Sequence, residues 1–179
     1  MDLKIVNAVG SGDLGTEIEL TRLAADIQGV KFDPDKYPGA YVRIEGVEPL
    51  ITVYRTGKYI VTGSKSDEEA YSCRHQFLKL LSEEEVLDKP DDDWFSMQNY
   101  VCTGALDQVQ NLNALAIGLG LESTEYEPEQ FPGLVYRPEN HPVVILIFAS
   151  GKVVVTGAKE LNQAEEAFQS LREELDALV

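Results

Sequence analysis

The feature that most constrains the folding of this 179-residue chain is an internal repeat. Residues 31–65 align with residues 125–159 without a gap, so that "TVYRTGKYIVTGSK" at 52–65 recurs as "LIFASGKVVVTGAK" at 146–159. The segments upstream also align, after a small difference in length. An internal repeat of this length indicates that the same supersecondary unit occurs twice in the fold. We therefore expect two pseudo-symmetric halves.

The boundary between the halves is expected at "DKPDDD", residues 88–93, an acidic stretch with the composition of a linker. It divides the chain into a first repeat, residues 1–90, and a second repeat, residues 91–179. The aspartates in this stretch are interpreted as a solvated linker rather than as a metal site.

Each repeat predicts the same order of elements: a strand, a short amphipathic helix, a meander of three strands and a long helix. The expected strands lie near residues 2–11, 40–46, 49–55, 58–64, 96–103, 134–137, 143–149 and 152–158. The expected short helices lie near residues 19–27 and 111–118. Ser66 and Glu69 form a capping box at the start of the first long helix.

Each long helix carries a single apolar stripe, which needs a sheet to cover. The stripes are Ala70, Cys73, Phe77 and Leu80 in the first repeat, and Ala164, Ala167, Phe168, Leu171 and Leu175 in the second. These patterns predict an α+β fold with one continuous antiparallel sheet and all helices on one face.

The other face of the sheet is expected to be open. In the hairpin of the second repeat, alternation places Leu146 and Phe148 on that face together with Val154, while Val153 and Val155 face the helices. A contiguous apolar surface that no helix covers is typical of a binding site.

The position of the charges modifies what the net charge alone suggests. The chain has 31 acidic and 15 basic residues, for a net charge of −16, which argues against nucleic acid. Yet three of the four basic residues of the second half, Arg137, Lys152 and Lys159, fall in the repeated strand segment. The sheet is therefore expected to be relatively positive and the helices acidic. Such an acidic surface also suits a protein of a halophilic cytoplasm.

Other classes of function receive little support. "GSGDLG" at 10–15 matches a dinucleotide fingerprint, but an antiparallel meander follows it, where that motif requires a parallel strand. His75 and His141 lack a catalytic or metal-binding partner at suitable spacing, so we expect no enzyme, no cofactor and no metal. Cys73 and Cys102 are interpreted as buried small side chains. No signal peptide or membrane span is expected, which predicts a cytoplasmic protein.

The sequence "EYEPEQFPGLVYR", followed by "LIFASGKVVVTGAK", resembles the TATA-binding proteins, and the archaeal ones most closely. The resemblance covers nearly the whole chain in both repeats. It implies a saddle, in which one continuous curved antiparallel sheet of about ten strands carries four helices on its convex face. It also implies a general transcription initiation factor that binds the minor groove of A·T-rich promoter DNA and kinks it with aromatic wedges. It also implies recruitment of transcription factor B and, through it, RNA polymerase, and it allows a homodimer formed through the sheet.

The resemblance assigns roles to individual residues. The wedges would be Tyr37, Tyr54, Phe131 and Phe148, and the two tyrosines depart from the phenylalanines of the family. The minor-groove contacts would be Asn7, Val9, Thr52, Ile60, Thr62, Asn99, Val101, Leu146, Val154 and Thr156. The phosphate contacts would be Arg43, Lys58, Lys65, Arg137, Lys152 and Lys159. The loops at 45–49 and 138–142 match the stirrups, and Glu139, Asn140 and His141 would dock transcription factor B.

Base-pair chemistry supports the same target. The minor groove at A·T pairs shows only acceptors, whereas a G·C pair adds the donor amino group of guanine. A smooth face of Val, Leu, Ile and Thr is expected to exclude that amino group. Two alternatives stay open: a divergent accessory copy with altered DNA or protein specificity, and a non-catalytic sheet module that binds a protein or a small ligand.

Overall fold

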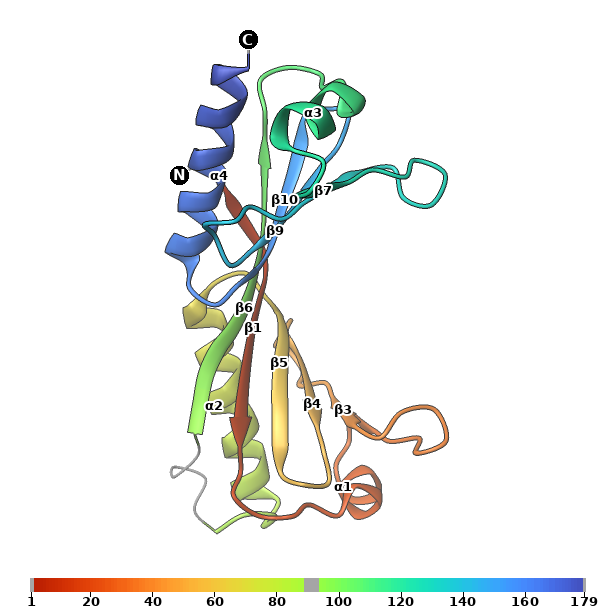
Figure 1. The fold of residues 1–179 in the computed structure, drawn as a ribbon. Coiled ribbons are helices and arrows are strands. Elements are labelled where there is room, and N and C mark those ends of the chain that lie inside the picture. The colour runs from red at the N-terminus through yellow and green to blue at the C-terminus, as the bar shows by residue number, and fades with distance from the viewer. Residues whose placement is uncertain (1, 89–93, 179) are drawn as a thin grey trace. The chain divides into compact units, whose positions relative to one another are not determined.

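The computed structural model describes residues 2–88 and 94–178, so most of the expected linker lies outside the described residues. This part of the chain contains ten strands and four helices, most of which are labelled in Figure 1. The strands pair in the order β2-β3-β4-β5-β1-β6-β10-β9-β8-β7, and each strand pair with a defined register is antiparallel. The predicted α+β class with two repeats is confirmed.

The two repeats have the same order of elements. The elements of the first are β1 (Lys4–Asp13), α1 (Leu20–Asp26), β2 (Val30–Lys31), β3 (Ala40–Val42), β4 (Leu50–Val53), β5 (Lys58–Ser64) and α2 (Asp67–Glu83). The elements of the second are β6 (Trp94–Ala105), α3 (Leu112–Leu119), β7 (Thr124–Glu125), β8 (Leu134–Tyr136), β9 (Val144–Ile147), β10 (Lys152–Ala158) and α4 (Leu161–Ala177).

The chain forms two compact units, and the first strand of each repeat is divided between them. The N-terminal unit extends from Asn7 to Gln98 and therefore includes the beginning of β6. The C-terminal unit combines the residues that precede Asn7 with those that follow Gln98. The boundary proposed for the sequence repeats, 1–90 and 91–179, stays a prediction.

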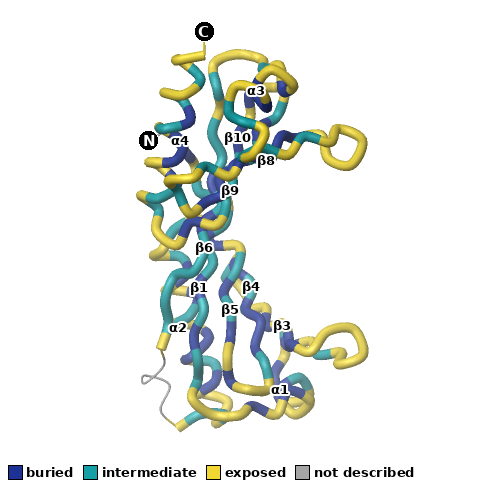
Figure 2. Tube along the Cα trace, viewed as in Figure 1, coloured by how far each residue is buried: buried dark blue, intermediate teal, exposed yellow. Residues whose placement is uncertain are grey.

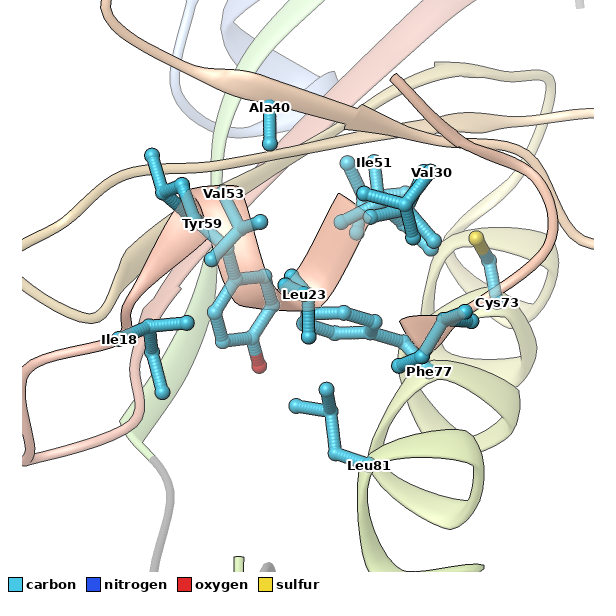
Figure 3. Close-up of a cluster of buried hydrophobic side chains, with 14 of the residues drawn as sticks. Ile18, Leu23, Val30, Ala40, Ile51, Val53, Tyr59, Cys73, Phe77 and Leu81 are labelled. Atoms are coloured by element: carbon cyan, nitrogen blue, oxygen red, sulfur yellow. The ribbon is translucent and has the colours of Figure 1, made fainter. Parts of the chain in front are cut away.

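The core of the N-terminal unit lies between its sheet and its two helices (Figure 3). Ile51 and Val53 of β4 point to the same side as Tyr59 of β5, because alternate side chains of a strand share a face. Leu23 of α1 and Phe77 of α2 cover them. All five side chains are buried, so the apolar stripes found in the sequence do bind the helices to this face.

The C-terminal unit repeats this arrangement with different side chains. Val153 and Val155 of β10 are fully buried, as predicted, and Ile145 and Ile147 of β9 are buried beside them. The helices contribute buried side chains from one stripe each: Leu112, Leu115, Ala164, Ala167, Phe168 and Leu171. Figure 2 shows the alternation as buried and half-buried segments along these strands.

The structure corrects some details of the predicted elements. The strands β2 and β7 were not expected individually, because a two-residue strand is too short to show an alternating pattern. The stripe predicted for α2 ended at Leu80, which is only partly buried against the core; the neighbouring Leu81 is buried instead. The Ser66 hydroxyl accepts the Glu69 N–H at 3.1 Å, which confirms the predicted start of this helix.

The "GSGDLG" segment is a strand rather than a phosphate-binding loop. Residues 10–13 belong to β1 and pair with β5. A Cβ atom at Gly10 would lie 2.2 Å from the ring of Phe95, and one at Gly12 would lie 2.5 Å from the ring of Tyr59. These glycines therefore make room for aromatic rings in the core of the N-terminal unit.

Candidate nucleic-acid interface

The face of each unit that is not covered by its helices carries the residues predicted to contact bases. Its half-buried members are Asn7, Val9, Tyr54, Ile60 and Thr62 in the N-terminal unit, and Asn99, Val101, Leu146, Phe148, Val154 and Thr156 in the C-terminal unit. Their partial exposure follows from the strand alternation that buries their neighbours. The predicted division into a helix-facing and an open side is confirmed.

An asparagine and a β-bulge form the same small motif in both units. The strand register shifts at Thr62–Gly63 and again at Thr156–Gly157, where two residues oppose one on the neighbouring strand. Both glycines have positive φ angles, of 88° and 89°, which favour glycine. The extra residue frees a backbone N–H, which must find another acceptor.

That acceptor is the asparagine side chain. The Asn7 Oδ1 accepts from the Gly63 N–H at 2.8 Å, and the Asn99 Oδ1 accepts from the Gly157 N–H at 2.9 Å. Because the carboxamide oxygen is held by the bulge, the amide NH₂ group of each asparagine is oriented away from it. Two N–H donors on a half-exposed apolar face suit the acceptors of an A·T minor groove.

Two phenylalanines meet at the outer end of the open face in the C-terminal unit. The Phe148 N–H bonds to the Lys152 carbonyl at 2.9 Å, which fixes this residue at the start of the β9–β10 turn. The Phe131 N–H bonds to the Glu127 carbonyl at 3.0 Å and closes a turn in the β7–β8 loop. The two ring centroids lie 5.9 Å apart in an edge-on contact.

Gly133 allows these rings to come together. A Cβ atom at this position would lie 2.9 Å from Phe131 and 3.0 Å from Phe148. The glycine of the sequence "FPG" therefore leaves the space in which the two rings pack. Phe131 is 38% exposed in spite of this contact.

The N-terminal unit has a different cluster at the matching place. Tyr37 and Tyr54 are joined through their hydroxyl oxygens, which lie 2.6 Å apart. Tyr41 stacks on Tyr37 with ring centroids 5.6 Å apart and an interplanar angle of 7°. Burial, followed by the hydrogen bond with Tyr37, raises the pKa of Tyr54 to about 12. We refer to Tyr37, Tyr41 and Tyr54 as the tyrosine cluster. The sequence alone assigned no role to Tyr41, whose counterpart in the second repeat is Val135.

Thr52 is less accessible than its predicted role requires. Only 7% of its surface is exposed, whereas its counterpart Leu146 is half-buried. Thr52 lies under the tyrosine cluster, because its methyl group and the rings of Tyr37 and Tyr54 all approach the same backbone position, Gly39. A direct contact between Thr52 and a base therefore needs the rings above it to move.

The six basic residues predicted to contact phosphates are all exposed: Arg43, Lys58, Lys65, Arg137, Lys152 and Lys159. In the described part of the chain none of them forms an ion pair; the ion pairs there use Arg22, Lys36, Lys79 and Arg172. Their charges are thus not neutralised inside the protein, in spite of the net charge of −16.

The loops expected to be the stirrups are not the loops that project from the sheet. The loops that project from the sheet in Figure 1 join β2 to β3 and β7 to β8, at residues 32–39 and 126–133. Glu139, Asn140 and His141 instead lie in the short connection between β8 and β9. Residues 45–49 occupy the equivalent connection between β3 and β4. Both connections of each repeat contain proline and acidic residues, so the sequence does not distinguish them, and the assignment of the stirrup role to residues 45–49 and 138–142 stays a prediction.

The structure shows few features of other functional classes. Within residues 2–88 and 94–178, no group of three or more His, Cys, Asp or Glu side chains is placed to hold a metal ion. None of the helices described has both the length and the apolar character that crossing a membrane requires. Cys73 and Cys102 are buried free thiols, as the sequence indicated.

Comparisons with known proteins agree on one family. The family model described as "Transcription factor TFIID (or TATA-binding protein, TBP)" matches residues 2–84 and 94–178. TATA-box-binding protein C of Halobacterium salinarum is 50% identical over 181 residues, with 100% of both chains covered. The TATA-box-binding protein of Archaeoglobus fulgidus is 44% identical over 178 residues, which cover 98% of this chain and 96% of the relative. Among solved structures, Methanococcus jannaschii TBP matches with a TM-score of 0.85 and 38% identity over 99% of each chain.

Proposed function

Because this chain belongs to the TATA-binding protein family, we propose that it is a transcription initiation factor of an archaeal, halophilic cytoplasm and binds A·T-rich promoter duplex through the open faces of both units. The observation that carries the proposal is the repeated motif of Asn7 with Gly63 and Asn99 with Gly157. It gives each unit a pair of fixed donors in an apolar surface, which is the complement of an A·T minor groove.

The remaining parts of the interface support a bent duplex. Phe131 and Phe148 provide an apolar wedge that can enter and unstack a flexible base step. The six unpaired basic residues, Arg43, Lys58, Lys65, Arg137, Lys152 and Lys159, then contact phosphates on either side. In this proposal phosphate contacts hold the duplex in place, while the donors and the apolar residues select A·T pairs.

Fluorescence anisotropy with two labelled duplexes of equal length tests this function. The A·T-rich duplex should bind and the G·C-rich duplex should not, at about 1–2 M KCl, where long-range attraction is screened. A double variant in which both Asn7 and Asn99 are changed to Asp is the matched negative control, because it keeps the oxygen that holds each bulge and removes the donors. Equal binding of both duplexes would favour the alternative of an accessory copy with altered DNA specificity, and absence of binding to both would favour a sheet module with another ligand.

We further propose that the projecting β7–β8 loop, residues 126–133, docks transcription factor B. The loop carries the exposed acids Glu127 and Glu129, and its tip is free of the lysine found in the matching loop, where Lys36 lies 3.7 Å from Asp33. An uncompensated acidic loop suits a partner with a basic surface. RNA polymerase would then be recruited through that partner.

A further inference from the structure

The tyrosine cluster makes the outer ends of the two open faces chemically different. Four matched positions carry Phe131, Val135, Leu146 and Phe148 in the C-terminal unit, without a polar side-chain atom. The same positions carry Tyr37, Tyr41, Thr52 and Tyr54 in the N-terminal unit, and each has a hydroxyl group. The N-terminal unit therefore carries a hydroxyl group at each of the four positions, and the C-terminal unit carries none. The glycine against which the two aromatic rings pack, Gly39 or Gly133, is the same in both units.

The hydroxyl pair keeps hydrogen-bonding capacity after it has formed. Tyr37 and Tyr54 together have two donors and four acceptor lone pairs, and their mutual bond at 2.6 Å uses one of each. One O–H donor and several lone pairs remain at a place where Tyr37 is 38% exposed. Such a pair can donate to an acceptor of the minor groove and can also accept from a donor.

The minor groove contains a donor only at G·C pairs, where guanine contributes its N2 amino group. Against Phe131 and Phe148 that amino group would be buried without a partner, which costs roughly 1–3 kcal/mol. Against the tyrosine hydroxyls it finds an acceptor and the cost is removed. The two units therefore differ in how they accommodate the same base pair.

We infer that the tyrosine cluster is a specificity determinant, which lets the end of the DNA site contacted by the N-terminal unit include a G·C pair, whereas the end contacted by the C-terminal unit must be A·T. This inference rests on the proposed function. The protein would also gain a preferred direction on a site with a G·C pair at one end, because only one orientation brings the hydroxyls to that pair.

The test uses three duplexes and avoids any need to know the binding direction. The first is an A·T-rich box, the second has a G·C pair at one end of the box, and the third has a G·C pair at both ends. The protein should bind the first two about equally, since it can turn its tyrosine cluster toward the single G·C pair. It should bind the third roughly tenfold more weakly, because one G·C pair then meets the phenylalanines.

Two matched variants test the cause. In the double variant with Tyr37→Phe and Tyr54→Phe, the affinity for the duplex with one G·C pair should fall roughly tenfold relative to the affinity of the same variant for the A·T-rich box, because only the hydroxyls are removed. In the reverse double variant, with Phe131→Tyr and Phe148→Tyr, the duplex with two G·C pairs should recover. The two variants change opposite units, so one of them suffices if the other fails to fold.

The outcomes distinguish failure of the proposed function from failure of the specificity determinant. Failure of the unmodified protein to bind even the A·T-rich box would reject the proposed function itself. Binding to that box with equal loss for one G·C pair in the unmodified protein and in the Tyr→Phe variant would reject only the specificity determinant. Loss of all binding in a folded Tyr→Phe variant would also reject it, because the hydroxyls would then serve binding in general.

Discussion

The side-chain oxygen of Asn7 accepts the backbone N–H of Gly63 at 2.8 Å, and the same bond joins Asn99 to Gly157 at 2.9 Å. The asparagine thus has two separable tasks, to satisfy the bulge through its oxygen and to present donors through its nitrogen. Asn7→Asp should keep the first task and lose the second, so that DNA affinity falls steeply while thermal stability stays nearly unchanged.

The matched variant Asn7→Ala should lose both tasks. Leaving the Gly63 N–H without this partner is expected to lower the free energy of unfolding by about 1–3 kcal/mol if water does not replace it. Thermal melts of both variants beside anisotropy titrations provide the measurement. A large loss of stability in Asn7→Asp, equal to that in Asn7→Ala, would show that the oxygen is not what holds the bulge.

The aromatic pairs are expected to contribute unequally to binding. Phe148→Ala removes half of the apolar wedge in the C-terminal unit and should damage affinity and the bend of the DNA far more than Tyr54→Ala. Tyr54→Phe should leave the affinity for an A·T-rich box unchanged or increase it, because the hydrogen bond between the hydroxyls of Tyr54 and Tyr37 is not needed there. Affinity and bend angle for the three variants on one duplex decide the order. The opposite order would place the main wedge in the N-terminal unit.

Salt is expected to have an unusual effect. Neutralisation of about six phosphates by basic residues would weaken an ordinary complex steeply as salt rises. In this chain 31 acidic residues oppose that attraction, and their repulsion of DNA is screened by salt. Affinity should therefore stay flat or rise between about 0.5 and 2 M KCl. A conventional steep decline over this range would mean that the phosphate contacts dominate.

The position of the docking loop can be tested with acidic residues of three loops. Glu129→Arg, in the projecting β7–β8 loop, should weaken a ternary complex with transcription factor B and leave DNA binding unchanged. Glu139→Arg, in the short β8–β9 connection, and Asp35→Arg, in the projecting loop of the N-terminal unit, should have little effect on the partner. Gel shifts with and without the partner measure both steps. Greater damage from Glu139→Arg would restore the position first expected from the sequence.

Alkaline pH should weaken the C-terminal unit through Tyr136. Burial, and then its hydrogen bond to Glu174 at 3.0 Å, raises the pKa of Tyr136 from 10.0 to about 12. A raised pKa means that the folded state binds the proton more tightly, so this stabilisation is complete below about pH 10 and is lost as pH approaches 12. The difference in unfolding free energy between the unmodified protein and Tyr136→Phe should therefore be constant up to about pH 10 and shrink above it. Urea titrations at several pH values measure this difference; one that shrinks already below pH 9 would contradict the assignment.

The duplication, the α+β class and the division of each strand into a buried and an open side could all be predicted from the amino-acid sequence. These features depend on local periodicity, which a strand such as β10 displays in every second residue, Val153 and Val155 against Val154. The sequence also predicted the starting residue of α2, since the bond between Ser66 and Glu69 is local. The family resemblance added candidate roles that no periodicity could provide.

The contacts between residues far apart in the chain could not be predicted in this way. The bond between Asn7 and Gly63 explains why both residues recur in the second repeat, but it depends on a strand register shift that the sequence pattern does not reveal. The hydroxyls of Tyr37 and Tyr54 meet because Gly39 leaves space beneath them. Burial of Thr52 and the location of the projecting loops have the same cause: both depend on which chain segments pack side by side, and that is settled by three-dimensional contact rather than by local composition.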